Sequence, residues 1–343
     1  FDETIQFRND TDFTVNNLTG MYLIDFSVES AEPGGISEPR ILQELEDYAN
    51  WLREQPETMH VNVFTDIMKR LNRNMHGDDD DMYTLPDERN LSAQYLLMYE
   101  MSLPYGLDLN NQVNVDKSAT RMVVTLYTLS TNQMLLLEQR ANAWLDENSQ
   151  FIKSAAASGP TMMFAHIGIR YIISMLGGTH VELILISLIL IVALRSVKLG
   201  IVSMVPNLVP AAMGFGIWGM LVGEVGLALS VVTSMTLGIV VDDTVHFMSK
   251  YQRARRENGL DSEQAVRYAF TSVGRALVTT SVVLIAGFLV LALSAFKLNS
   301  GMGLLTALVI GLALIADFLL LPPLLMKLEE KSDEKKPATV PAA

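Results

Sequence analysis

The chain has 343 residues, 50% of them hydrophobic and 18% charged, a composition that excludes a disordered or fibrous protein and a length that suggests about two domains. Its formal net charge of −13 is divided unevenly, since residues 1–177 hold 26 acidic and 12 basic side chains whereas residues 178–343 hold 12 and 13. An acidic soluble half is therefore joined to an almost neutral apolar half, and the acidic half has no basic surface that would suit nucleic acid, which excludes that class of partner.

The first 160 residues have the pattern of an α+β domain. Three segments alternate apolar and polar residues as strands do, namely 21–30, 60–65 and 119–129. Three others have helical spacing, namely 38–53, 91–103 and 130–148. Along the chain the predicted elements follow the order β-α-β, then an insertion that contains helix 91–103, then β-α. This order predicts that residues 1–160 form a ferredoxin-like sandwich, in which helices cover one face of a sheet.

An acidic run at residues 76–82, HGDDDDM, offers oxygen atoms that suit a hard cation. It lacks the alternating ligand spacing and the turn glycine of an EF-hand loop, so we interpret it as a solvated acidic loop. The chain has no cysteine, which excludes disulfides, thiolate metal sites and cysteine nucleophiles. We expect no metal and no cofactor.

The second half contains apolar runs long enough to cross a bilayer, which takes about 20 residues. We predict five spans, at residues 178–194, 199–223, 226–247, 276–296 and 302–325. Gly159 and Pro160 end the soluble domain, and residues 161–177 are predicted to form a stalk helix continuous with the first span. The membrane bundle then covers residues 161–328, and residues 329–343 are expected to be a disordered cytoplasmic tail.

Basic residues gather in alternate loops of this half, as the positive-inside rule requires of cytoplasmic loops. They follow the first, third and fifth spans: Arg195, Lys198, Lys250, Arg253, Arg255, Arg256, Arg267, Arg275, Lys327, Lys331, Lys335 and Lys336. The opposite loops carry Glu224 and Lys297. The acidic domain is therefore expected in the periplasm or outside the cell. Because the sequence starts at Phe1 without methionine, we expect a fragment of a longer protein.

Two adjacent carboxylates, Asp242 and Asp243, lie in the third predicted span. A charge at mid-membrane costs about 2.5–3.5 kcal/mol on insertion scales, so such residues usually face the bundle interior and mark proton or ion pathways. Ser234, Gly238, Asp242 and His246 are four residues apart and share one helix face. We expect the two carboxyls to titrate as a coupled pair with His246 nearby. The alternative is a pair at the cytoplasmic edge whose side chains reach the interface.

Further polar residues lie in or near the spans. Thr244 follows the pair, and the hydroxyls of Thr279, Thr280 and Ser281 are placed to hydrogen-bond the carboxylates, although hydroxyls in membrane helices often bond their own backbone. Asp317 in the fifth span is either a second relay site or a polar contact near the interface. Pro206 and Pro210 are expected to kink the second span, and Gly303, Ala307 and Gly311 form a small-residue face for close packing.

Three segments carry a resemblance to a known family: GIVVDDTVHF at 238–247, RSVKLGIVSMVPNLVP at 195–210 and AFTSVGRA at 269–276. They resemble the C-terminal half of resistance-nodulation-division (RND) transporters, in the lipid-exporter branch of the mycobacterial large membrane proteins (MMPL). The resemblance implies that Asp242 is the proton carrier of the tenth span and Gly238 its motif glycine. Asp243 stands where the family commonly has tyrosine, which leaves open which carboxyl carries the proton.

The resemblance also implies a whole transporter of twelve spans, of which seven and the first porter domain are missing here. We expect a proton-driven exporter of hydrophobic or lipid-like substrates in the bacterial inner membrane, with residues 1–160 as a periplasmic porter domain. The missing N-terminal half, a homo-oligomer and periplasmic proteins are the expected partners, and protons the coupling ion.

Two other classes of function compete with export. One is a sterol-sensing or protein-export accessory protein of the same fold, because fold does not decide function. The other is an intramembrane aspartyl protease, for which Asp242 and Asp317 provide two aspartates without the glycine spacing that such proteases need. No G-x-S-x-G, H-E-x-x-H or P-loop pattern occurs in the sequence. We therefore expect a transporter and no enzymatic activity.

Overall fold

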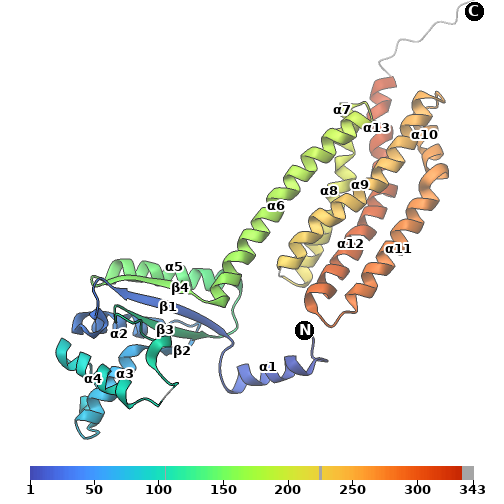
Figure 1. Ribbon diagram of the computed structural model, residues 1–343. Coiled ribbons are helices and arrows are strands. Elements are labelled where there is room, and N and C mark those ends of the chain that lie inside the picture. Colours follow the sequence, from blue (N-terminus) through green and yellow to red (C-terminus); the bar gives the residue numbers. More distant parts are fainter. Residues whose placement is uncertain (105, 224–225, 334–343) are drawn as a thin grey trace, which may run out of the picture. The chain divides into compact units, whose positions relative to one another are not determined.

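The computed structural model describes residues 1–104, 106–223 and 226–333, and the chain divides into two compact units (Figure 1). One unit is Gln6–Ile169, and the other combines Phe1–Ile5 with the chain from Arg170 onward. The helices of the first unit are α1 (Gln6–Asn17), α2 (Pro39–Arg53), α3 (Phe64–Met75), α4 (Arg89–Ser102) and α5 (Thr131–Asn148).

The first unit is built on a four-stranded antiparallel sheet. Its strands are β1 (Tyr22–Ser30), β2 (Thr58–Asn62), β3 (Ala119–Leu126) and β4 (Ile152–Ser158), in the order β2-β3-β1-β4. Helix α2 connects β1 to β2, and α5 connects β3 to β4. Each β-α-β unit is therefore split, with a strand of the other unit between its own two strands.

One face of the sheet carries the core. Along β1 the side chains of Ile24, Phe26 and Val28 are buried, whereas Leu23 and Ser27 on the opposite face are exposed. Helices α2 and α5 cover the buried face side by side. Phe26 meets Tyr48 of α2 edge-on with ring centroids 5.7 Å apart, and Tyr48 and Trp51 both stack on Trp144 of α5. The alternation seen in the sequence thus has its expected physical basis, a sheet with one apolar face.

Three elements of this unit differ from the sequence-based expectation. The second strand ends at Asn62, because Phe64, Met68 and Leu71 have helical spacing and begin α3 instead. Strand β4 was not predicted, since its sequence IKSAAAS has few of the β-branched and aromatic residues that mark strands. It is an edge strand, held by its pairing with β1. Helix α1 was not predicted either, and none of its residues is buried.

Glu44 of α2 joins this helix to the start of β4. Its carboxylate accepts hydrogen bonds from the Ser149 hydroxyl at 2.7 Å and from the backbone N–H groups of Gln150, Phe151 and Ile152 at 2.8–3.1 Å. Partial burial of the carboxyl opposes ionisation, but these donors together outweigh it, and the pKa of Glu44 is lowered. The carboxylate of Glu44 therefore accepts the backbone N–H groups of the turn that leads into the edge strand β4.

We expect this contact to make the stability of the first unit depend on pH. A group whose pKa is lower in the folded state contributes stability that is present above its unfolded pKa and is lost as the pH falls through the folded pKa. Glu44→Gln should therefore weaken hydrogen-exchange protection of β4 at neutral pH by about 1 kcal/mol, and this deficit should shrink in acid. Glu54→Gln, at the exposed end of the same helix, should leave the protection unchanged. An acid-independent deficit in Glu44→Gln would contradict the assignment.

The second unit is helical. It contains most of α6 (Pro160–Ala193), followed by α7 (Val197–Val202), α8 (Met204–Leu221), α9 (Leu227–Arg256), α10 (Ser262–Ala269), α11 (Arg275–Ala292), α12 (Lys297–Leu319) and α13 (Leu321–Asp333). Five helical stretches in the described part of the chain are long and apolar enough to cross a membrane: Pro160–Ala193, Val197–Leu221, Leu229–Arg256, Ser262–Ala292 and Lys297–Leu328. Each contains all or most of one predicted span.

The helical stretches begin and end at other residues than the predicted spans do. The stalk and the first span are one continuous helix, α6. The third stretch continues past residue 247 to Arg256, and α13 runs to Asp333, into the predicted tail. Residues 334–343 and Glu224 lie outside the described residues. Helices α9 and α13 extend beyond the predicted spans because the span prediction assigned the basic residues at their ends to loops.

Helix α12 is the central helix of the bundle, since it contacts α8, α9 and α11. The predicted small-residue face of α12 is confirmed as a packing feature. A Cβ atom built on Gly303 would lie 2.5 Å from the carbonyl oxygen of Phe288 and 2.7 Å from the backbone nitrogen of Ala292, both in α11. Ala307 is buried and Gly311 approaches Ile285. The two helices are therefore in close backbone contact.

Two interruptions break the regular helices. The second stretch is divided at Ser203 into α7 and α8. Pro206 and Pro210 lie in α8, and the division just before them is the kind of interruption that prolines are expected to cause. Between α10 and α11, residues Phe270–Gly274 form a π-helix. The ring of Phe270 packs between Phe247 of α9, at 5.0 Å, and Phe318 of α12, at 5.1 Å. The π-helix is thus anchored to two other helices by aromatic contacts.

Candidate functional site

The adjacent carboxylates of α9 point in different directions. Asp243 is directed toward α11, where its carboxylate accepts a hydrogen bond from the Ser281 hydroxyl at 3.1 Å. Asp242 is 73% exposed within this chain, and its Oδ1 lies 3.5 Å from Nε2 of His246, which is 61% exposed. The predicted neighbourhood of Asp242 and His246 is therefore present, and the two carboxylates have separate partners.

A groove of about 1050 Å³ runs along this face of α9 beside α11. It is lined by Asp242, Asp243 and His246 together with small, apolar and hydroxyl side chains: Met235, Gly238, Ile239, Val273, Ala276, Leu277, Thr279, Thr280, Val283 and Leu284. The helical spacing that places Gly238, Asp242 and His246 on one face explains why all three line it. The lining is mostly apolar, so the carboxylates and the imidazole are its principal ionisable groups.

Two of the predicted hydroxyl contacts are not made, and one is. Thr279 and Thr280 donate to the carbonyl oxygens of Arg275 and Ala276 in their own helix, at 2.9 and 3.1 Å. Ser281, one residue further, reaches Asp243. Ser234, at the far end of the predicted stripe, instead donates to the Glu182 carboxylate of α6. The sequence offered a signal for Glu182, because it is an acidic residue inside an apolar run.

A second polar cluster lies inside the bundle, next to the pair in sequence but on another face of α9. Thr244 Oγ1 lies 2.7 Å from Oδ1 of Asn207 in α8 and 3.0 Å from Oδ1 of Asp317 in α12. All three side chains are buried, and Asp317 is 2% exposed. The sequence singles out Thr244 and Asp317 separately, and it contains no pattern that joins them to Asn207. Their contact depends on the packing of three helices.

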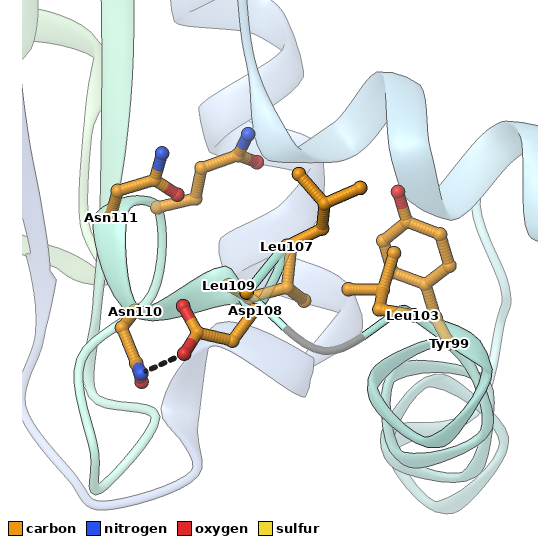
Figure 2. Close-up of a pocket in the computed structure, with 9 residues that line it drawn as sticks. Tyr99, Leu103, Leu107, Asp108, Leu109, Asn110 and Asn111 are labelled. Carbon is orange, nitrogen blue, oxygen red and sulfur yellow. Dashed lines mark hydrogen bonds between the residues drawn. The ribbon is translucent and has the colours of Figure 1, made fainter.

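The first unit has a pocket of its own, of about 610 Å³, between the end of α4 and the short turn Leu109–Asn111. Figure 2 shows Tyr99, Leu103, Leu107 and Leu109 with the polar side chains of Asp108 and Asn110, which are joined by a hydrogen bond of 2.7 Å. The described lining offers apolar area with a polar rim. Asp108 is the carboxylate among its described lining residues.

The acidic run forms an exposed turn. Asp79 accepts the backbone N–H of Asp81 and so caps the short helix Asp80–Met82, and Arg73 pairs with Asp80 at 3.2 Å. Among the described residues, no group of three or more His, Asp or Glu side chains is arranged to hold a metal ion. The arrangement fits the interpretation of this run as a solvated loop.

Comparison with known proteins places this bundle in a family. The sequence model of the MMPL family matches residues 107–338, more than half of the chain. A membrane protein of Methanocaldococcus jannaschii is 30% identical over 153 residues, which are 45% of this chain and 39% of that protein. The aligned part is thus about two fifths of the relative's length. With five helical stretches that can cross a membrane and the family match over all of them, the chain is a multi-pass membrane protein and belongs to the MMPL family.

Proposed function

We propose that this chain is part of a proton-driven exporter of hydrophobic or lipid-like substrates. The observation that carries the proposal is the Asp242–Asp243 pair in the middle of α9, at a mostly apolar groove. Carboxylates at such a depth are expensive unless the protein uses them, and they are typical of proton pathways. Protonation of one carboxyl would change its contact with Ser281 or His246 and so the packing of α9 against its neighbours.

The exposure of Asp242 and His246 supports a further part of the proposal. A carboxylate that faced lipid along this groove would be strongly unfavourable, so the groove needs to be covered by protein. We propose that an N-terminal half of the same transporter covers it and brings its own polar side chains to Asp242. A homo-oligomer and periplasmic proteins are further proposed partners.

The orientation of the helices supports an inner-membrane protein with its basic ends in the cytoplasm. Arg256 of α9 donates to the carbonyl oxygen of Leu194 at the end of α6, and Lys198 donates to that of Leu328 in α13. The basic residues that follow the first, third and fifth stretches therefore lie at one end of the bundle, as the positive-inside rule requires. We propose that the unit Gln6–Ile169, at the other end of α6, lies in the periplasm.

We also propose that this unit is a ferredoxin-like porter domain. The strand order β2-β3-β1-β4 with antiparallel pairing and two split β-α-β units supports that assignment. In this proposal the domain handles the substrate outside the membrane, and the pocket beside α4 is available for apolar contact. The chain then needs protons as coupling ion and no cofactor, and it catalyses no chemical reaction.

The proposal is tested by difference infrared spectroscopy of the full-length protein in lipid between about pH 5 and 9, the range in which a carrier of physiological protons must titrate. We expect a protonated-carboxyl band that titrates in this range and is lost in Asp242→Asn or in Asp243→Asn. Glu257→Gln, a carboxylate paired with Arg253 at the end of α9, is the matched control and should leave the band unchanged. A spectrum in which neither aspartate variant removes a titrating band would contradict proton coupling at the pair and favour the sensing or accessory function.

A further inference from the structure

The buried cluster of Asn207, Thr244 and Asp317 lies apart from the groove that holds Asp242. Its members come from α8, α9 and α12, and none of them lines the groove. A carboxyl that is 2% exposed, in the central helix of the bundle, needs a partner that stabilises it in one protonation state or the other. The hydrogen bonds around Thr244 relate the orientation of its partners to the protonation state of Asp317.

The number of protons available to the cluster decides which of its contacts can be hydrogen bonds. Thr244 has one hydroxyl proton, yet its oxygen lies closest to two side-chain oxygen atoms, Oδ1 of Asn207 and Oδ1 of Asp317, with the carbonyl oxygen of Val240 further away at 3.4 Å. An amide oxygen and an ionised carboxylate can only accept, so the hydroxyl can satisfy one of them. With the amide oxygen of Asn207 toward Thr244, both contacts are hydrogen bonds only if Asp317 carries a proton and donates it to Thr244, which in turn donates to Asn207.

The amide of Asn207 supplies an independent second observation. Its Nδ2 is buried and has no hydrogen-bond partner among the residues that the structure describes. Rotating the amide by half a turn would exchange Nδ2 and Oδ1, which are nearly equal in size. Nδ2 would then donate to Thr244, and the Thr244 hydroxyl would be free to donate to an ionised Asp317. The same three side chains thus have one chain of hydrogen bonds among themselves for the protonated carboxyl and another for the ionised one.

We propose that Asp317 is a proton-binding site of its own, and that Thr244 and Asn207 are positioning residues whose hydrogen bonds reverse direction when its proton is exchanged with solvent. Because the three side chains join α8, α9 and α12, the proton changes contacts among three helices at once. The inference deepens the proposed proton coupling, since it adds a second site to the carrier. It does not require that the Asp242–Asp243 pair itself carry protons.

The charged surroundings of Asp317 are simple. Asp243 of α9, the residue before Thr244, is a neighbouring carboxyl group, and its carboxylate accepts a hydrogen bond from Ser281 of α11. Asn207 is the contact from α8, and the π-helix presents the aromatic ring of Phe270 to Phe318. A proton on Asp317 therefore also removes a repulsion between two carboxylates in neighbouring helices.

The test is infrared spectroscopy of the full-length protein in lipid, comparing H₂O with D₂O, because a protonated carboxyl gives a band that moves on deuteration. We expect such a band in the wild type at neutral pH, its loss in Asp317→Asn, and its persistence in Asp242→Asn and Asp243→Asn. Asparagine at 317 resembles the protonated carboxyl in shape and can donate to Thr244, so this variant should fold. An unchanged band in Asp317→Asn would overturn the proposal.

A second set of variants tests the positioning role. Thr244→Val removes the acceptor of the Asp317 proton and should shift the band to higher frequency, while Thr244→Ser should restore the wild-type position. Thr236→Val is the matched control, because Thr236 is equally buried in α9 but donates to the carbonyl oxygen of Val232 in its own helix. If Thr244→Val leaves the band in place, the hydroxyl does not hold the proton and the relay is wrong. If neither Asp242→Asn nor Asp243→Asn removes a band while Asp317→Asn does, the proposed carrier fails while the Asp317 site still stands.

Discussion

Replacing Phe26 by alanine is expected to lower the free energy of unfolding of the Gln6–Ile169 unit by about 3–5 kcal/mol. The side chain lies in the centre of β1, is fully buried, and meets Tyr48 edge-on beneath the two helices that cover the sheet. Alanine would leave a cavity between a sheet and two helices, elements that cannot easily collapse into it. Hydrogen–deuterium exchange of the full-length protein, read out for the β1 and β3 amides by mass spectrometry, measures the loss of protection.

Leu23→Ala is the matched control for this prediction. Leu23 lies three residues earlier in the same strand, on the opposite face of the sheet, and is 41% exposed. Its truncation should change the protection of β1 by less than about 1 kcal/mol, as is usual for surface positions. Equal losses in the two variants would mean that the open face of the sheet is also packed in the whole protein.

Gly303→Ala should destabilise the membrane bundle, although alanine is normally favoured over glycine in a helix by about 0.5–1 kcal/mol. The added methyl group would lie 2.5 Å from the Phe288 carbonyl oxygen and 2.7 Å from the Ala292 nitrogen. Both atoms belong to the backbone of α11, so the whole helix has to move, and overpacking of this kind costs about 1–3 kcal/mol. A lower midpoint of thermal unfolding in detergent is the expected result.

Gly287→Ala provides the comparison within α11, because no described atom beyond the neighbouring residues and backbone of its own helix lies within 4 Å of the position of its added Cβ. This variant should unfold at the wild-type temperature or above it. If Gly303→Ala proves as stable as Gly287→Ala, then α11 and α12 are further apart in the membrane than their backbone contact here requires.

The parts of the fold that the sequence predicted are those in which one element carries its own pattern. The alternation in β1 and β3 and the apolar length of the five membrane stretches are local properties, readable without a partner. Strand β4 has no such pattern, and its conformation depends on hydrogen bonds to β1 and on Glu44. The start of α3 was misread because a short apolar run suits a strand as well as a helix.

The same division holds for the candidate site. Helical spacing within α9 was enough to place Gly238, Asp242 and His246 on one face. Helical spacing also predicts that Asp242 and Asp243 point about 100° apart, because they are adjacent residues. Which of the two meets α11 depends on packing and could not be predicted. The link from Thr244 to Asp317 could not be predicted, since it joins residues far apart in the chain through the arrangement of three helices.

The π-helix Phe270–Gly274 sets the rotation of α11 relative to α10. A π-helical turn accommodates one residue more than an α-helical turn, so converting it to α-helix would rotate everything that follows by about 100° relative to α10. Ser281 would then swing away from Asp243, while Phe270 would lose its position between Phe247 and Phe318. A small change of winding near the basic end of the bundle would thereby be transmitted along α11 as a rotation, and would exchange one set of side chains facing α9 for another.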